Sequence, residues 1–555
     1  MIRTSLIRTT LFLSVAIAPL SFAQQKNPPK PQVEKTTPAP AAETPKTEEP
    51  RQEAQQPHRE ASQAAAPEAP RPAPQGLHFD MTEPAPVITH HQITIGGRTI
   101  HYTATVGKLP VRDAVGNTDA LMFYVAYTED GVPAGQRPVT FAFNGGPGSA
   151  SIWLHMGALG PRKVVLQPNG FMPPAPYRLE DNTQSILDKT DLVLIDAIGT
   201  GYSRPANLEA AKRFWSVKGD IEAFGEFIRL YITRNQRWSS PLFILGESYG
   251  TTRAGGIAGY LADRGISFNG ITLLSSVLNF ETLEFNKTND IPYPLILPSY
   301  TMIAAYHHKL APDLMQNLEQ TRKDSEQFAM NDYMSALNKG DALTPQERQN
   351  VIDKLARYTG LSKEIIDQAD LRIDVQVFTH YLLADQKLRV GRLDGRYSGP
   401  DPDGFMNTRF YDPTGSATQP PFTAVFYDYL SRELNYKTDT PYFVSAHDAY
   451  GEHVFDWNWG SAGEGFPDTA SALRQAIVKD PYLKIMVMEG YYDLATPYLA
   501  ANYTMDHLDL PEQYRKNISY ATYDAGHMVY LNTPMLKKMH DDVDGFMNMA
   551  ASKAQ

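Results

Sequence analysis

Cysteine is absent from this chain of 555 residues, and long apolar runs and surplus positive charge are scarce. Without thiols the protein has no disulfide bond, no cysteine nucleophile and no cysteine-based zinc site or lipid anchor. No stretch after residue 23 approaches the length of apolar sequence that spans a bilayer, so we expect no transmembrane segment. The formal net charge of −11, with no basic stripe, argues against nucleic acid as a partner. Stability must therefore come from burial of an apolar core.

The first 75 residues lack the pattern of a folded domain. Residues 1–23 carry two arginines, then an apolar run, then small residues before a probable cleavage point, which is typical of a secretory signal peptide. Residues 24–75 contain twelve prolines and no aromatic residue, so they cannot bury enough apolar surface to offset their ordering entropy. We expect an exported protein, periplasmic or secreted, with a disordered Pro/Ala-rich linker before its folded part.

Short apolar runs mark the strands of the remaining chain. Residues 91–95 and 98–106 alternate apolar and polar around two glycines, which predicts a β-hairpin. A helical pattern at 217–232 separates two nearly all-apolar runs, which are typical of strands covered on both faces. We therefore predict an α/β fold with a mostly parallel central sheet and helices on both faces. The other expected strands are 120–127, 139–143, 192–195, 242–245, 271–278, 483–488 and 518–523.

Between these strands, residues 280–442 have a mostly helical pattern. A capping box begins at Thr344, and Ser362 is a second candidate cap. The chain returns to strands afterwards, so we predict a helical cap inserted between two core segments, 76–279 and 443–555. An independent helical domain is the alternative, and it is less favoured because the candidate site residues fall on both sides of the insertion.

The candidate nucleophile is Ser248, within Gly246-Glu-Ser-Tyr-Gly250. This segment follows an apolar strand and leads into a stretch of small residues, an order that predicts a strand, a sharp turn and a helix. A serine at such a turn is pushed clear of the backbone, and glycines two residues to either side remove the Cβ atoms that would clash there. An ordinary loop serine would need neither the strand nor the helix.

A serine hydroxyl needs a base to remove its proton, usually an imidazole held by a carboxylate. Asp493 and His527 each follow a predicted strand near the C-terminus, where sheet enzymes build their sites. Glu489 and Asp524 compete with Asp493 for the acid role, although Asp524 lies only three residues from the histidine and is more typical of a turn. We expect neither a metal nor another cofactor.

Donors for an oxyanion can come from Asn144-Gly-Gly-Pro-Gly148, directly after the strand at 139–143. A phosphate-binding loop is the rival interpretation, and it is weaker because no Gly-Lys-Ser/Thr follows.

Taken together, these segments resemble the serine carboxypeptidases, a family with the α/β-hydrolase fold and an inserted helical cap. The similar segments run in the family's order over most of the folded chain. They are Asn144-Gly-Gly-Pro-Gly148, Leu159-Gly-Pro161, Ile195-Asp-Ala-Ile-Gly-Thr-Gly-Tyr-Ser203, Gly246-Glu-Ser-Tyr-Gly250, Gly490-Tyr-Tyr-Asp493 and Ala525-Gly-His-Met528.

The resemblance implies roles for eight residues. Ser248 would be the nucleophile, His527 the base and Asp493 its orienting acid, as the residues themselves suggest. The resemblance adds an oxyanion hole and a site for the terminal carboxylate of a peptide substrate, and a neutral glutamate can donate to that carboxylate where an ionised one would repel it. The oxyanion donors would be the N–H groups of Gly146 and Tyr249, and the carboxylate would bind Asn144, the Gly145 N–H and Glu247.

Three positions depart from the family pattern: Ala142 stands where the family has tryptophan, Ala158 where it has glutamate, and Ser149 where it has cysteine. Ala158 removes the usual acidic partner of Glu247. Since two acids can no longer share a proton there, we expect a weaker preference for acidic pH or an altered carboxylate site.

The leading hypothesis is a serine carboxypeptidase that removes C-terminal residues from peptides through an acyl-enzyme on Ser248. The departures motivate a second hypothesis, an esterase or acyltransferase with the same triad. A third is a catalytically silent binding protein displayed on the linker, which would have no physical need for an intact triad.

Overall fold

The computed structural model describes residues 77–407, 411–451, 454–460 and 465–551. These residues belong to one compact unit, which spans Pro72–Gln555. The predicted signal peptide (1–23) and nearly all of the predicted linker (24–75) precede that unit, and both lie outside the described residues.

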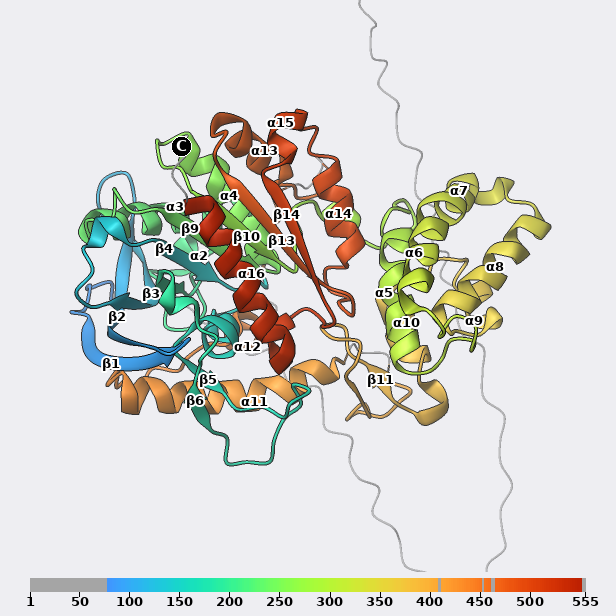
Figure 1. Cartoon of the computed structure of the whole chain (residues 1–555), viewed down its shortest axis with the longest axis horizontal. Coiled ribbons are helices and arrows are strands. Elements are labelled where there is room, and N and C mark those ends of the chain that lie inside the picture. Colours follow the sequence, from blue (N-terminus) through green and yellow to red (C-terminus); the bar gives the residue numbers. More distant parts are fainter. Residues whose placement is uncertain (1–76, 408–410, 452–453, 461–464, 552–555) are drawn as a thin grey trace, which may run out of the picture. The chain divides into compact units, whose positions relative to one another are not determined.

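A ten-stranded sheet forms the centre of the unit (Figure 1). Its order is β1-β2-β3-β7-β4-β9-β10-β13-β14, with β8 (Arg204–Pro205) paired beside β3. The pairs from β1 to β7 are antiparallel, and those from β7 to β14 are parallel, so the predicted mostly parallel sheet is confirmed. The bounds are β1 Val87–Ile95, β2 Arg98–Arg112, β3 Thr118–Glu129, β4 Val139–Phe143, β7 Asp191–Ile195, β9 Leu242–Glu247, β10 Gly270–Leu274, β13 Lys484–Gly490 and β14 Ile518–Tyr523.

Local sequence explains most of the strand ends. Gly96 and Gly97 both have positive φ, as the tight turn between β1 and β2 requires. β10 is shorter than the predicted strand 271–278, because Ser275 has a φ of 52° and leaves the extended conformation, although its N–H still donates to the Met488 carbonyl of β13. The chain therefore leaves the sheet beside the ends of its neighbouring strands.

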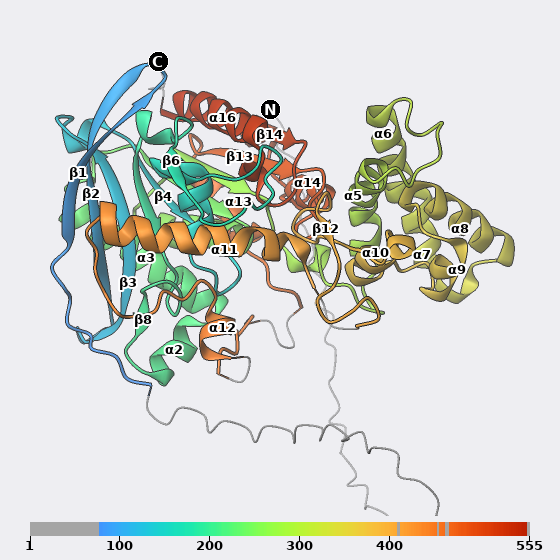
Figure 2. The same cartoon turned by 90° about the horizontal axis from the view of Figure 1, so that it is seen from below.

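Helices cover both faces of the sheet, as predicted (Figure 2). On one face α3 (Val217–Arg234), α4 (Tyr249–Ala262) and α13 (Ala470–Lys479) share an apolar cluster with alternate side chains of β4, β9 and β13. On the other face α16 (Thr533–Ala551) packs on the opposite side chains of the same strands. Burial on both faces explains why these strands are almost wholly apolar.

The predicted insertion has its own apolar cluster. Six helices contribute to it, and Leu494, which follows the candidate acid Asp493, is buried within it as well. The capping box at Thr344 and the cap at Ser362 are both present, at the starts of α8 and α9. The helices are α5 Pro292–Tyr306, α6 Leu318–Phe328, α7 Met334–Lys339, α8 Pro345–Thr359, α9 Lys363–Gln368 and α10 Val375–Tyr381.

One long helix within 280–442 does not pack with these six. α11 (Pro413–Asp428) lies along the sheet domain, apart from α5 to α10 (Figure 2). Its Phe422 contacts Trp153 and its Phe426 contacts His155, so its apolar side joins the cluster of the sheet. The segment 280–442 therefore divides between two cores, a division that helical periodicity alone does not reveal.

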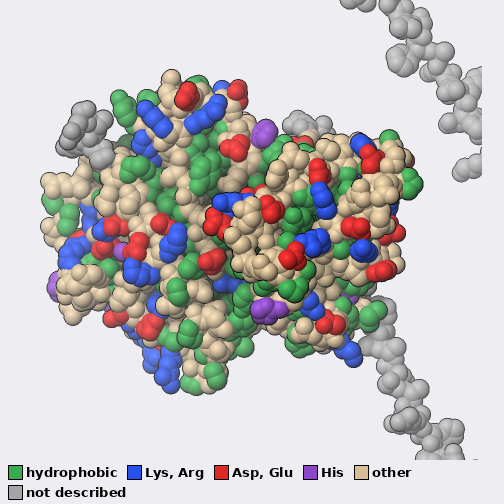
Figure 3. All heavy atoms as spheres, turned by 45° about the vertical axis from the view of Figure 1, so that its right-hand side comes forward, with side chains coloured by type: hydrophobic (Ala, Val, Ile, Leu, Met, Phe, Trp, Pro, Cys, Tyr) green, Lys and Arg blue, Asp and Glu red, His purple; other side chains and the backbone are tan. Residues whose placement is uncertain are grey.

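None of the described helices is long and apolar enough to cross a membrane. On the face drawn in Figure 3, acidic and basic side chains are interspersed.

Candidate active site

The turn at Ser248 has the geometry that its glycines predict. Ser248 lies between β9 and α4 with φ 62° and ψ −135°, a conformation that non-glycine residues rarely adopt. A Cβ on Gly250 would lie 2.9 Å from the Phe143 carbonyl oxygen, and one on Gly246 would overlap the Gly250 carbonyl. The half-buried serine is thus presented at the carboxyl end of a central strand.

Asp493 orients His527. Its carboxylate oxygen Oδ2 lies 2.7 Å from Nδ1 of the histidine, and its side chain is fully buried. Oδ1 accepts the backbone N–H groups of Ala495 and Thr496 at 2.7 and 3.0 Å, and the Thr496 hydroxyl donates to Oδ2 at 2.6 Å. Burial by itself lowers the pKa of His527, but the charge and hydrogen bond of Asp493, together with the charge of Glu247, raise it above its usual value.

Ser248 reaches the same edge of the sheet through β10. The Ser248 N–H donates to the carbonyl of Leu274, the last residue of β10. The hydroxyl of Ser275, which follows Leu274, donates to the His527 carbonyl at 2.6 Å. Within the described residues, no hydrogen bond joins the Ser248 hydroxyl to the His527 ring. Such bonds are often long without substrate and tighten in the Michaelis complex.

The two competing carboxyl groups, Glu489 and Asp524, are not the ones that bond to His527. Glu489 is buried, and its Oε1 accepts the Ser276 N–H at 3.2 Å. Burial, reinforced by the nearby Asp493 charge, raises the pKa of Glu489 well above its usual range. Asp524 is exposed, and its main-chain carbonyl accepts from Arg396. Of the three candidate acids, Asp493 makes the bond to the histidine.

The loop Asn144–Gly148 lies against the start of α4. A Cβ on Gly145 would lie 2.5 Å from the backbone nitrogens of Tyr249 and Gly250, so only glycine permits this approach. Neither the Gly146 nor the Tyr249 N–H donates a backbone hydrogen bond within the described part of the chain, which leaves both for an oxyanion. Arg253 of α4 secures the loop by donating to the Asn144 carbonyl at 2.7 Å.

Glu247 is buried beside the dyad, with 3% of its surface exposed. The Tyr530 hydroxyl donates to its Oε2 at 2.8 Å. Burial raises the pKa of Glu247 to about 7, while the charge of His527 and the tyrosine bond act in the opposite direction. Ala158 provides no second acid to raise the pKa of Glu247 by sharing a proton, but burial raises that pKa instead.

A family model described as serine carboxypeptidase matches residues 106–392, a little over half of the chain. The chain belongs to the serine carboxypeptidase family. The matched segment contains the loop at Asn144 and the turn at Ser248, whereas Asp493 and His527 follow it. The Ser275–His527 and Tyr530–Glu247 hydrogen bonds connect this later part of the chain to the matched segment.

The solved structures that are similar to this chain are distant from it. An esterase from Thermogutta terrifontis is 12% identical, with a TM-score of 0.32, over 80% of this chain and 99% of that one. A peroxisomal α/β-hydrolase from Saccharomyces cerevisiae is 10% identical, with a TM-score of 0.37, over 82% and 91%. A carboxyl esterase from Bacillus coagulans is 12% identical, with a TM-score of 0.33, over 80% and 98%. No curated protein matches the sequence.

The structure adds supporting residues that sequence reasoning missed. Tyr530 contacts Glu247, Thr496 contacts both members of the dyad, and Arg253 with its partner Asp220 fixes the loop at Asn144. Arg253 gives one signal in the sequence, since it is a lone charge in a helix of small and apolar residues. The tyrosine and the threonine give none without the fold.

A pocket of about 520 Å³ opens beside the loop at Gly146. Its charged lining includes Arg392, which lies close enough to His527 to lower the pKa of that histidine, although the net effect of all its neighbours is to raise it. The described residues contain no group of three His, Cys, Asp or Glu side chains that could hold a metal ion. The residues that line the pocket include Gly146, Pro147, Phe280, Arg392, Trp459 and Leu494.

Proposed function

We propose that this member of the serine carboxypeptidase family removes C-terminal residues from peptides through an acyl-enzyme on Ser248. The single observation that carries the proposal is a buried carboxyl group, Glu247, next to an oriented His527–Asp493 pair. A general esterase needs the pair but has no use for such a group. A neutral glutamic acid is suited to a substrate that ends in a carboxylate.

In the first half of the reaction, the Ser248 hydroxyl attacks the carbonyl carbon of the last peptide bond, and His527 Nε2 takes its proton. Asp493 stabilises the imidazolium that forms and does not itself take the proton. The N–H groups of Gly146 and Tyr249 donate to the tetrahedral oxyanion. The imidazolium then gives its proton to the leaving amine, and the C–N bond breaks.

In the second half, water attacks the acyl ester while His527 again accepts the proton. Collapse of the second tetrahedral intermediate breaks the bond to Ser248, and the imidazolium returns the proton to the serine oxygen. The products are a shortened peptide and a free amino acid, and the enzyme is regenerated.

Substrate selection takes place at the other end of the leaving residue. The terminal carboxylate accepts hydrogen bonds from the Asn144 side chain, the Gly145 N–H and neutral Glu247. At a pH above about 7 Glu247 ionises and repels that carboxylate, so peptide binding weakens.

Hydrolysis of an N-blocked dipeptide and of its C-terminal amide, between about pH 4 and 8, tests the proposal. We expect kcat/KM for the free acid to exceed that for the amide by about tenfold to a hundredfold below neutral pH, the usual worth of a hydrogen bond to a charged group. Ser248→Ala should abolish both activities. Equal cleavage of acid and amide, with activity retained in Ser248→Ala, would contradict it.

Ala158 and Ala142 favour a second candidate, an esterase or acyltransferase with the same triad. Rapid turnover of p-nitrophenyl esters with negligible cleavage of free-acid peptides would support this alternative. If a fluorophosphonate probe failed to label Ser248, a catalytically silent binding protein would be the better description.

We also propose that the protein is exported to the periplasm or beyond, because residues 1–23 have the pattern of a cleaved signal peptide. N-terminal sequencing of the mature protein should begin at or near Gln24. A mature chain that retains Met1 would exclude this processing.

A further inference from the structure

Tyr530 follows His527 in the chain and contacts Glu247 of the proposed carboxylate site. It belongs to the short 3₁₀ helix η9 (Val529–Leu531), three residues after His527. Its side chain is 2% exposed, and its hydroxyl donates to Glu247 at 2.8 Å across 283 residues of sequence. One segment thus carries both the candidate base and the hydrogen-bond partner of Glu247.

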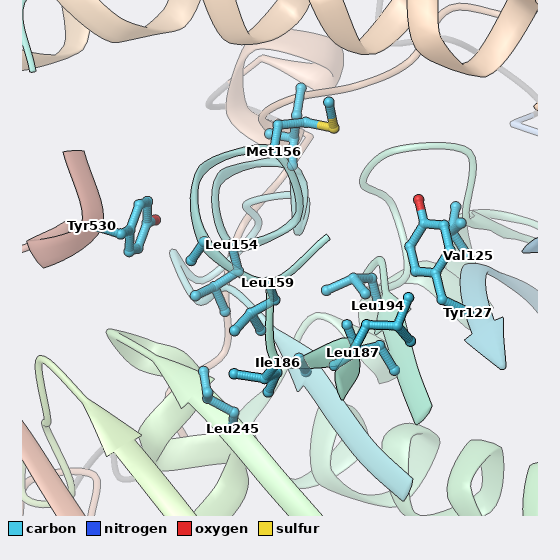
Figure 4. Packing of buried hydrophobic residues seen from close by; sticks show 14 of the residues in the cluster. Val125, Tyr127, Leu154, Met156, Leu159, Ile186, Leu187, Leu194, Leu245 and Tyr530 are labelled. Atoms are coloured by element: carbon cyan, nitrogen blue, oxygen red, sulfur yellow. The ribbon is translucent and has the colours of Figure 1, made fainter. Parts of the chain in front are cut away.

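Gly157 leaves the space that the Tyr530 ring occupies. Tyr530 extends from η9 toward the turn that carries Leu154 and Leu159 (Figure 4). A Cβ on Gly157, in that turn, would lie 2.5 Å from the ring, so the turn leaves room for a tyrosine. The residue after Gly157 is Ala158, which offers no polar group of its own.

The groups that act on Glu247 come from three further segments. His527 and Tyr530 follow β14, Asp493 follows β13, and Asn144 follows β4. After burial, the His527 charge and the Tyr530 hydrogen bond lower the pKa of Glu247, the Asp493 charge raises it, and the Asn144 side chain lowers it through a hydrogen bond. Burial also raises the pKa of Tyr530 well above its usual range, so its hydroxyl remains a donor.

We propose that Tyr530 is a positioning residue for substrate recognition, whose hydroxyl engages Oε2 of Glu247 and so directs the acidic proton of that residue, through Oε1, at the free carboxylate of a peptide. The inference rests on the proposed function and deepens it. A phenol, unlike a second carboxyl group, adds no charge to the site as the pH rises. The site is therefore neutral up to the point where Glu247 itself ionises.

The decisive variant is Tyr530→Phe. It keeps the ring against Gly157 and removes one donor that stabilises ionised Glu247, so Glu247 should ionise at higher pH. The loss of one hydrogen bond predicts an upward shift of the alkaline limb of kcat/KM, for an N-blocked dipeptide, by about 0.5 to 1 pH unit. Without the Tyr530 hydrogen bond the Glu247 carboxyl group is no longer fixed in the orientation that binds the substrate carboxylate. KM for that substrate should therefore also rise about fivefold, with kcat little changed.

Tyr523→Phe is the matched control. Tyr523 is also buried and donates to a carboxylate, Asp542, at 2.7 Å, and its strand β14 is separated from β9, which carries Glu247, by β10 and β13. Its substitution should leave the pH profile unchanged. The ethyl ester of the same N-blocked amino acid, which has no free carboxylate, should show no shift with either variant.

Three results would overturn the inference: an alkaline limb that stays in place in Tyr530→Phe, a limb that moves downward, or equal losses on peptide and ester. Equal losses would mean that the hydroxyl has a structural role only.

A readout without substrate separates this inference from the proposed function. When the pKa of a buried carboxyl group is raised in the folded protein, the free energy of unfolding falls as pH rises, because the unfolded chain has already released the proton. The fall ends once the pH passes the pKa of the folded state. Between about pH 7 and 9 the unfolding midpoint should therefore fall further in Tyr530→Phe than in Tyr523→Phe. If the wild-type enzyme ignored free carboxylates but this difference appeared, the peptidase proposal would fail and the link between Tyr530 and Glu247 would stand. No difference would overturn that link.

Discussion

Asp493 and Glu489 lie four residues apart at the end of β13, yet their carboxyl groups have different hydrogen-bond partners. Asp493 accepts two backbone N–H groups and the Thr496 hydroxyl in addition to the His527 ring. Glu489 accepts one backbone N–H and has one oxygen without a partner. Burial raises the pKa of Glu489 and keeps it neutral, whereas the donors around Asp493 hold that carboxyl group in the position that orients the imidazole.

The two residues make a matched pair of variants. Asp493→Asn should lower kcat by on the order of 10⁴, the usual cost of losing the orienting acid of such a triad, because an amide favours the wrong tautomer of His527. Glu489→Gln should retain activity, since glutamine has nearly the shape and charge of a neutral glutamic acid. Steady-state kinetics on one peptide and one ester checks both variants. Comparable losses in the two would reverse the assignment.

At the scale of elements, the site depends on how closely the loop after β4 approaches the start of α4. Gly145 meets the backbone of that helix, which cannot yield as a flexible side chain could. Arg253 holds the loop from the same helix, through the Asn144 carbonyl, and bonds to Asp220 of α3 at 2.7 Å. The proposed oxyanion donors are thus fixed by two packed helices and not by the loop alone.

Gly145→Ala tests this contact. The added methyl group should push the loop from α4 and misplace one oxyanion donor, which lowers kcat by about 10² to 10³. Gly545→Ala is the control, because its Cβ would meet nothing in the middle of α16; it should leave kcat unchanged and raise stability by up to about 1 kcal/mol. Kinetics and thermal unfolding measure both effects. Near-normal kcat in Gly145→Ala would show that the loop tolerates displacement.

Over the whole molecule, two buried groups respond to acid pH in opposite ways, Glu247 in the site and His155 outside it. Lower pH keeps Glu247 neutral and favours the proposed carboxylate site. His155, however, is buried between Tyr127 and α11, with the Tyr127 hydroxyl at 2.6 Å from its Nε2. Burial lowers the pKa of His155 to about 3, so it is neutral in the folded protein but gains a proton in the unfolded chain below about pH 6.5.

The contribution of His155 to the free energy of unfolding should therefore decrease as pH falls. A histidine whose pKa is lower in the folded state favours unfolding once the unfolded chain binds the proton, which costs about 1.4 kcal/mol between pH 7.5 and 5.5. His155→Gln keeps an acceptor for Tyr127 and removes this titration. The stability difference between wild type and variant, from denaturant or thermal unfolding, should narrow by that amount over the same interval. A constant difference would contradict the assignment.

The sequence by itself determined the local features of this protein. Apolar runs specified the strands, the capping box at Thr344 specified the start of α8, and the glycines around Ser248 specified a turn that only small residues permit. The order of Ser248, Asp493 and His527 pointed to the site, because each follows a strand. These features depend on neighbours within a few residues, where backbone geometry and periodicity suffice.

Tertiary structure decided what depends on contacts between distant segments. It selected Asp493 over Glu489, divided the helices of 280–442 between two cores, and placed Tyr530 against Glu247 across 283 residues of sequence. The ionisation of Glu247 and His155 belongs to this class as well. Burial sets the pKa of both residues, and burial exists only after remote segments have packed.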